Sequence, residues 1–239
     1  MQIEGKNAVR ELFRSGKTID KLVVQNDLRD KEISSLIKSA RDGGVKINNV
    51  NKAILDKESK TGKHQGVIAY VTDFSYVELE TLLNNGEKPN FLLILDGVED
   101  PHNLGSILRV AECAGVDGVI IGKHRCASVN ETVCRVSAGA SEHVKVARVT
   151  NVNYAIEFLK EKGVWIYAAD MDGDSIYDTD LRGNCAIVIG SEGFGIHKVT
   201  KEICDGVISL PMFGKVNSLN ASVATGVVAY EVVRQRNVK

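Results

Sequence analysis

The chain has 239 residues, of which 44% are hydrophobic and 26% are charged, a composition typical of a globular protein long enough to bury a sizeable core. This composition argues against intrinsic disorder, collagen and coiled coil, and the length suggests one or two domains. No apolar stretch approaches the roughly 18 residues needed to cross a membrane, and the start lacks the apolar segment of a signal peptide, so we expect a soluble, cytoplasmic protein without a membrane partner.

Cysteine and histidine residues are scattered along the chain. The five cysteines are odd in number and form no Cys-x-x-Cys pair, which favours reduced thiols. The five histidines show no His-Glu-x-x-His motif and no spacing typical of zinc ligands. We therefore expect no structural metal.

Charge is unevenly distributed although the formal net charge is only -1. Residues 1–72 carry 14 basic and 9 acidic side chains, whereas residues 73–239 carry 16 basic and 22 acidic ones. A basic first segment on an acidic body suggests a polyanion-binding module joined to another domain. A lysine-rich solvated surface explains the same asymmetry equally well, so both interpretations stay open.

Residues 1–72 show the pattern of a small α/β domain. Hydrophobic periodicity and stop signals predict three helices and three strands, with helices at 7–14, 31–41 and 52–60 and strands at 21–25, 45–50 and 66–71. Between residues 72 and 90 the apolar pattern weakens to one helix-like piece at 76–83, followed by turn-forming and charged residues. We therefore place a linker at 73–90.

From residue 91 onward, short apolar strands alternate with helices. Strands are predicted at 91–95, 118–121, 165–169, 186–189 and 207–210, and helices at 104–114, 152–162, 197–204 and 218–236. Apolar runs without alternation are typical of a parallel sheet covered on both faces. Residues 91–239 are therefore expected to form an open α/β sheet that binds its ligands at the carboxyl ends of the strands.

The loop after strand 91–95 contains Asn103 and, six residues later, Arg109. Asn103 is suited to capping the helix that follows as well as to a site. Arg109 lies in an apolar stretch, where an arginine is either a surface side chain or a phosphate clamp. The residues alone favour the surface position for Arg109.

Strand 186–189 runs into Gly190-Ser191-Glu192-Gly193-Phe194-Gly195. Three glycines in six residues let a ligand contact main-chain groups. The glycine order differs from the dinucleotide fingerprint, and the loop follows the fourth strand instead of the first. A nicotinamide or flavin site is therefore the weaker interpretation of this loop.

Strand 207–210 leads into a third polar loop that precedes the last helix. Pro211 ends the strand, and Asn217 or Ser218 can cap the helix. Small residues at 221–226 let another helix approach closely. Ser218 and Asn220 either belong to a packed helix start or face a ligand.

Together the three loops resemble the motifs of the SpoU (TrmH-like) RNA ribose 2'-O-methyltransferases. The first motif, Asn-x-Gly with an Arg six residues after the Asn, is matched by Asn103, Gly105 and Arg109. The second, Gly-x-Glu-x-x-Gly-Ile, is matched by Gly190, Glu192, Gly195 and Ile196. The third, apolar-Pro-Met followed by Ser-Leu-Asn-x-Ser-x-Ala, is matched by residues 210–212 and 218–224, with Leu210 and Ala221 where the family has Ile and Val. Residues 5–9 and 64–67 resemble the L30e-like RNA-binding domain of the RlmB-like subgroup.

The resemblance implies a fold and a cofactor. The fold is α/β, with a SPOUT-type methyltransferase domain containing a trefoil knot at 91–239 and a small L30e-like α/β RNA substrate-binding domain at 1–72. S-adenosylmethionine is expected in the knot, held largely by main-chain groups. The implied cofactor residues are Gly190, Leu210, Leu219, Ile189 and Met212.

The resemblance also implies catalytic residues and a reaction. Arg109 would anchor a substrate phosphate and activate the 2'-OH, or act as the base, although its high pKa in solution makes it an awkward base. Asn103, Glu192, Ser218 and Asn220 would orient the hydroxyl and the neighbouring loops.

The reaction implied by the resemblance is S-adenosylmethionine-dependent 2'-O-methylation of a nucleotide, expected to be a guanosine, in large-subunit ribosomal RNA. A homodimer is implied, with the last helix in the interface and each active site drawing on both subunits. A transfer RNA ribose 2'-O-methyltransferase, a non-catalytic RNA-binding factor and a Rossmann oxidoreductase are the alternatives.

Overall fold

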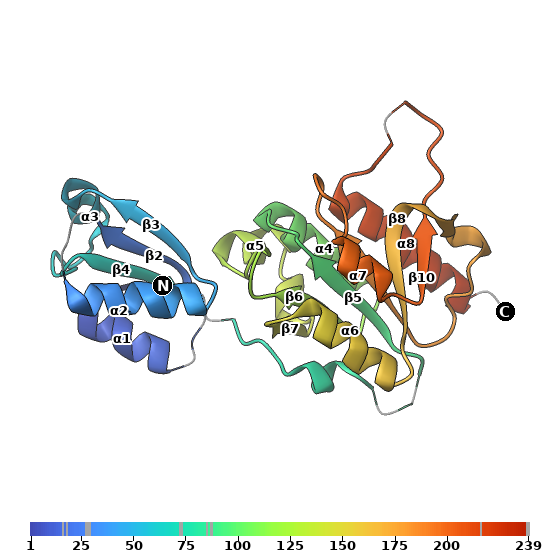
Figure 1. Ribbon diagram of the computed structural model, residues 1–239, viewed down its shortest axis with the longest axis horizontal. Helices are drawn as coiled ribbons and strands as arrows, with labels where there is room; N and C mark the ends of the chain where they lie inside the picture. Colours follow the sequence, from blue (N-terminus) through green and yellow to red (C-terminus); the bar gives the residue numbers. More distant parts are fainter. Residues whose placement is uncertain are drawn as a thin grey trace. The chain divides into compact units, whose positions relative to one another are not determined.

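The structure is a computed structural model, and it describes residues 1–15, 17, 19–26, 30–71, 74–84, 86, 88–215 and 217–237. The chain forms two compact units (Figure 1), which we call the first unit, Met1–Ser75, and the second unit, Tyr76–Lys239. Among the described residues, no helix is long and apolar enough to cross a membrane.

The first unit is a four-stranded sheet with three helices. Its elements are β1 (Gln2–Glu4), α1 (Lys6–Arg14), β2 (Ile19–Gln25), α2 (Lys31–Asp42), β3 (Lys46–Val50), α3 (Lys52–Glu58) and β4 (Val67–Val71). The strand order is β1-β4-β2-β3, with β2 parallel to β3 and β4 antiparallel to both β1 and β2. The predicted elements of residues 1–72 are present, and β1 was missed because it has only three residues and no apolar pattern of its own.

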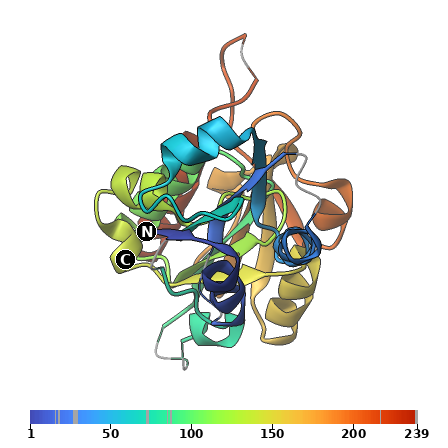
Figure 2. The same ribbon diagram turned by 90° about the vertical axis from the view of Figure 1, so that its left-hand side faces the viewer.

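Alternate side chains of this sheet enter two separate cores. Leu22 and Val24 of β2 pack with α1 and α2, whereas Val23 packs with Leu55 of α3. This follows from the two-residue period of a strand, which sends successive side chains to opposite faces. Figure 2 shows α1 and α2 on one side of the sheet and α3 on the other.

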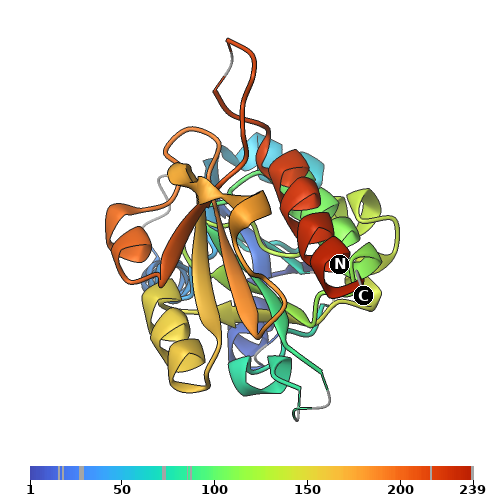
Figure 3. The same ribbon diagram turned by 90° about the vertical axis from the view of Figure 1, so that its right-hand side faces the viewer.

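The second unit is built on a six-stranded sheet in which every described pairing is parallel. Its elements are η1 (Leu79–Leu82), β5 (Phe91–Asp96), α4 (Pro101–Cys113), β6 (Gly118–Gly122), α5 (Glu131–Val136), η2 (Ala140–Glu142), β7 (Val146–Val149), α6 (Val152–Glu161), β8 (Trp165–Ser175), η3 (Ile176–Asp178), β9 (Cys185–Gly190), α7 (Lys198–Glu202), β10 (Gly206–Ser209) and α8 (Ala221–Asn237). The strand order is β10-β8-β9-β5-β6-β7. Figure 3 shows α6 and α7 on one face and α4 and α8 on the other, which confirms the predicted parallel sheet covered on both faces.

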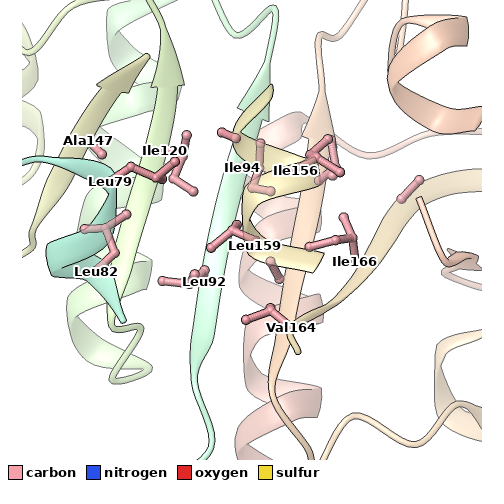
Figure 4. Packing of buried hydrophobic residues seen from close by; sticks show 14 of the residues in the cluster. Leu79, Leu82, Leu92, Ile94, Ile120, Ala147, Ile156, Leu159, Val164 and Ile166 are labelled. Carbon is pink, nitrogen blue, oxygen red and sulfur yellow. The ribbon is translucent and has the colours of Figure 1, made fainter. Parts of the chain in front are cut away.

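The core of the second unit includes part of the segment expected to be a linker. Leu92 of β5 packs in one apolar cluster with Leu159 of α6 and Leu82 of η1 (Figure 4). A Cβ built on Gly118 of β6 would lie only 2.5 Å from Cδ2 of Leu82, so η1 is pressed against the sheet. The helix-like piece predicted at 76–83 is a single 3-10 turn that helps to close this core.

Besides the 3-10 turns η2 and η3, one strand and one helix of the second unit were not predicted, and another strand is longer than expected. The edge strand β7 has four residues and α5 has six, too few for a clear hydrophobic period. Strand β8 continues past residue 169 to Ser175. Its residues there are mostly polar, and their main chain pairs with β10, with Asp174 opposite Ile208. No apolar run marks this extension in the sequence.

Candidate cofactor and substrate site

The loops after β5 and β9 lie side by side at the carboxyl edge of the sheet. Leu95 of β5 is in register with Ile189 of β9, and Asp96 with Gly190. A Cβ built on Gly97 would lie 3.5 Å from Cβ of Ser191. Because parallel neighbours end at the same edge, the fold brings the loop that precedes the first motif against the second motif.

A cavity of about 670 Å³, which we call the larger cavity, opens between the second half of β8 and the loops after β9 and β10. Its lining includes all five residues expected to bind the cofactor, namely Ile189, Gly190, Leu210, Met212 and Leu219. The volume lies within the range of small-molecule and cofactor sites. The sequence motifs that follow β9 and β10 therefore share one ligand-sized space.

The charges around the larger cavity are negative. Asp170 and Glu192 are the only charged side chains among the described residues that line it. Asp170 accepts a hydrogen bond from Nζ of Lys201 at 2.9 Å, and the same lysine holds the pKa of Asp172 below its usual value through a side-chain hydrogen bond. Two carboxylates and no lining cation suit a positively charged ligand and disfavour the pyrophosphate of a dinucleotide, which is bound by helix N-termini and cations.

The glycine loop folds back closely on Gly190. A Cβ there would lie 2.3 Å from the carbonyl carbon of Gly195 and 2.4 Å from the main-chain nitrogen of Ile196. Ser191 and Gly195 exchange two main-chain hydrogen bonds of 3.0 Å, which close the turn. Only glycine fits at position 190 without moving the main chain of this wall.

Asn103, Glu192 and Asn220, one from each motif, form a hydrogen-bonded cluster. Nδ2 of Asn220 donates to Oδ1 of Asn103 at 2.9 Å and also to the Glu192 carboxylate. Oδ1 of Asn220 accepts from the main-chain nitrogens of Ser222 at 2.9 Å and Val223 at 3.3 Å. One amide therefore orients two polar side chains and is itself fixed by the first turn of α8.

Of the two roles left open for Asn103, the N-cap is wrong. Helix α4 begins at Pro101, and the side chain of Asp100 caps it by accepting from the main-chain nitrogen of His102 at 2.9 Å. Proline at the first helical position after a capping aspartate is the stronger start signal. Asn103 is instead buried in the first turn, where its side chain is free to join the polar cluster.

The last helix also starts later than expected. Helix α8 begins at Ala221 and not at 218, and its capping side chain belongs to Asn220 instead of Asn217 or Ser218. Several residues suited to capping follow one another here, so composition alone could not select among them. Ser218 lines the larger cavity.

A smaller cavity of about 280 Å³ lies next to the larger one. Asn103 and Glu192 line it, and the turn at 191–194 lines both cavities. Of the residues expected to orient the substrate, Asn103 therefore faces the smaller cavity, Glu192 faces both and Ser218 faces the larger one.

Arg109 stands apart from both cavities of the chain. It is exposed on α4, lines neither cavity, and has no hydrogen-bond or ion-pair partner among the described residues. The next residue, Val110, lies 3.8 Å from where a Cβ on Gly226 of α8 would be. The structure therefore joins Asn103, Glu192 and Asn220 by hydrogen bonds. Arg109 lies away from them, on the surface of α4, the helix that packs against α8.

The structure adds a buried carboxylate that the sequence analysis did not single out. Asp96, at the carboxyl end of β5, accepts hydrogen bonds of 2.9 Å from both the main-chain nitrogen and Nδ1 of His197. The only signal in the sequence is an acidic residue directly after a buried apolar strand. This pair ties the end of the glycine loop to the carboxyl end of β5.

These features define an α/β protein with a ligand site of loops and main chain at the carboxyl edge of a parallel sheet. The profile of the SpoU rRNA Methylase family matches residues 90–230. A second profile, described as RNA 2'-O ribose methyltransferase substrate binding, matches residues 2–77. The chain belongs to the SpoU family of RNA methyltransferases.

Known relatives match over nearly the whole chain. A protein of Staphylococcus saprophyticus is 43% identical over 98% of this chain and 96% of its own length. One of Bacillus subtilis is 44% identical over 98% of this chain and 95% of its own. The first is named "Putative TrmH family tRNA/rRNA methyltransferase", and the second has the same name followed by YacO.

Solved structures confirm the predicted fold class. The A. aeolicus TrmH/SpoU tRNA modifying enzyme is 29% identical, with a TM-score of 0.57 over 66% of this chain and 80% of that one. The SpoU methyltransferase AviRb of Streptomyces viridochromogenes, in complex with AdoMet, has a TM-score of 0.64 at 23% identity over 99% of this chain and 90% of that one. At 23% identity, the similarity to AviRb shows a shared fold and no more.

Proposed function

We propose that the chain transfers the methyl group of S-adenosylmethionine to a ribose 2'-OH of RNA. The observation that carries the proposal is the larger cavity, which collects every residue expected to bind the cofactor. The cofactor, when bound, supplies an activated methyl group. We also propose that the second unit contains the trefoil knot that is typical of this family's catalytic domain.

The wall of the larger cavity suits this cofactor. Ile189, Leu210 and Leu219 supply apolar surface, and the tight turn at Gly190 exposes main-chain groups that can recognise an adenine. Asp170 and Glu192 favour the positive charge of the sulfonium group.

The smaller cavity suits the ribose. A 2'-OH is a poor nucleophile at neutral pH, so the protein must position it and assist its deprotonation. Asn103 and Glu192, held by Asn220, would orient this hydroxyl beside the cofactor. Arg109 would anchor a phosphate and activate the hydroxyl.

We propose a homodimer because Arg109 lies outside the cavities of its own chain. Helix α8, which packs on α4, presents Val223, Val227 and Tyr230 to solvent, with exposed fractions of 50%, 38% and 52%. Their spacing places these apolar side chains on one helix face. A second copy covering this face would let Arg109 approach the partner's site.

We further propose an RlmB-like enzyme that acts on a guanosine of large-subunit ribosomal RNA in the cytoplasm. The match of the first unit to a substrate-binding profile supports an RNA that is selected outside the catalytic unit. Five free cysteines fit a reducing compartment. Transfer RNA is the second candidate, since the relatives are named for both RNAs.

The test of this function uses the full chain. We expect calorimetry to show binding of S-adenosylmethionine, and labelled cofactor to transfer its methyl group to ribosomal RNA. Mapping of ribose methylation in RNA from a strain lacking the gene would then identify the nucleotide, and a site in transfer RNA would replace the ribosomal assignment. RNA binding without methyl transfer would favour the non-catalytic alternative.

Removal of the first unit is expected to weaken RNA binding and to spare the cofactor. Deleting residues 1–75 removes the basic segment, so both the RNA affinity and its salt dependence should fall. Salt titrations of RNA binding and cofactor calorimetry on residues 76–239 measure both effects. An unchanged affinity and salt slope would mean that the segment is only a lysine-rich surface.

A further inference from the structure

An exposed arginine stands on a strained loop beside the smaller cavity. Arg125 follows β6 and has φ 55°, a conformation that residues other than glycine adopt rarely and that concentrates at functional sites. The loop is fixed to the segment between β5 and α4, because the main-chain nitrogen of Ala127 donates to the carbonyl oxygen of Val98 at 2.8 Å. The neighbouring Cys126 thiol lies 3.4 Å from the carbonyl oxygen of Leu95.

The guanidinium of Arg125 is oriented by a short chain of polar groups. Asp96 accepts a hydrogen bond from Nδ1 of His197 at 2.9 Å, which fixes the orientation of the imidazole ring and of Nε2 on its other side. Nη1 of Arg125 lies 3.5 Å from this Nε2. The buried Asp96 carboxylate thus orients the histidine ring, and the guanidinium of Arg125 lies beside that ring.

No carboxylate pairs with Arg125 in the part of the chain that the structure describes. Arg182 and Arg234 do pair with carboxylates, those of Asp180 and Glu231, both at 2.8 Å, whereas Arg125, like Arg109, has none among the described residues. The oxygens of Asp96 are already engaged by His197. Most N–H donors of the Arg125 guanidinium are therefore free to bind an external anion.

The arginine lies next to the space expected to hold the ribose. A Cβ on Gly97 would lie 3.6 Å from Cε1 of His197, and Gly97 lines the smaller cavity together with Asn103. One imidazole ring therefore separates the wall of that cavity from the guanidinium of Arg125. An anion there would be close to a nucleotide in the cavity.

We propose that Arg125 binds a phosphodiester group of the RNA beside the nucleotide to be methylated, with His197 and Asp96 as positioning residues. The planar fork of a guanidinium matches a phosphate, and the strained main chain at φ 55° presents that fork. This site is distinct from Arg109 on α4, and it rests on the proposed function because it presumes an RNA substrate.

The first test removes the side chain in the full-length protein. Arg125→Ala is expected to lower the affinity for a transcript of large-subunit ribosomal RNA by about tenfold, the loss of a charge-assisted hydrogen bond. The slope of log affinity against log salt should fall by about 1. Arg125→Lys should recover part of the affinity, and His197→Ala should cause a smaller loss.

The matched control is Arg182→Ala, an exposed arginine that precedes β9 and is paired with Asp180. It should leave the RNA affinity and the salt slope unchanged. In methyl-transfer assays Arg125→Ala should raise the KM for RNA with little change in kcat or in the Kd of S-adenosylmethionine. A fall in kcat with an unchanged KM would overturn the assignment as an anchor.

The second test uses the strained main-chain conformation of Arg125. Arg125→Gly should raise the melting temperature, because glycine adopts positive φ readily, and yet weaken RNA binding. Ala138→Gly, at φ 52°, should raise stability without affecting RNA. Full RNA affinity in Arg125→Gly with a lowered melting temperature would assign Arg125 a structural role instead.

The proposed function and the proposed phosphate site at Arg125 can be disproved separately. If the wild-type chain neither binds S-adenosylmethionine nor transfers a methyl group, the proposed function is wrong, while the RNA affinities still report on Arg125. If the wild type is active and the Arg125 variants bind RNA normally, the phosphate site is wrong and the proposed function stands.

Discussion

Arg109→Ala is expected to abolish methyl transfer while leaving the fold and the cofactor affinity nearly unchanged. Arg109 is exposed and lines neither cavity, and surface substitutions of this kind usually change stability by less than about 0.5 kcal/mol. Loss of a charge-assisted phosphate contact costs about 1.5–3 kcal/mol, and loss of hydroxyl activation lowers the rate by about 100-fold or more. Methyl-transfer rates at saturating RNA and cofactor calorimetry measure the two effects.

Arg109→Lys is the conservative control, and it should recover little activity because lysine keeps the charge without the planar fork. If the partner subunit uses Arg109, mixing inactive Arg109→Ala and Glu192→Gln chains should restore part of the activity, since some mixed dimers then hold one intact site. Near-normal turnover in either Arg109 variant would return Arg109 to a surface role and leave the 2'-OH activator unidentified.

The order of strands and helices in the second unit could be read from the sequence because buried parallel strands are continuous apolar runs. All six residues of β5 are buried, and such a run is visible without a structure. Short elements were missed because their patterns are too brief, as in β1 and α5. The polar end of β8 was missed because its pairing with β10 is made by the main chain.

The site could be predicted only in part. Physical patterns pointed to three loops at one edge of a sheet, and the resemblance to a family selected residues within them. The contact between Asn220 and Asn103 joins residues 117 positions apart, and that between His197 and Asp96 joins residues 101 apart. No local pattern carries such pairings, because they depend on how loops pack after the sheet has formed.

Gly190→Ala is expected to lower both the cofactor affinity and the stability of the chain. The added methyl group would lie 2.3 Å from the carbonyl carbon of Gly195 and 2.5 Å from its oxygen. These are main-chain atoms of a turn closed by hydrogen bonds between Ser191 and Gly195, so no side chain can rotate away. Overpacking of this kind costs about 1–3 kcal/mol, and a similar loss in binding corresponds to about 10- to 100-fold in affinity.

Gly183→Ala, in the turn just before β9, is the matched control for Gly190→Ala. No heavy atom lies within 4 Å of a Cβ built there, and its φ is not positive, so the variant should keep full cofactor affinity. It should also gain about 0.4–1 kcal/mol of stability, since alanine restricts the unfolded chain more than glycine does. Calorimetry with S-adenosylmethionine and denaturant unfolding measure both variants. If Gly190→Ala binds the cofactor as tightly as Gly183→Ala, the glycine loop is not a wall of the cofactor site, and the larger cavity loses its assignment.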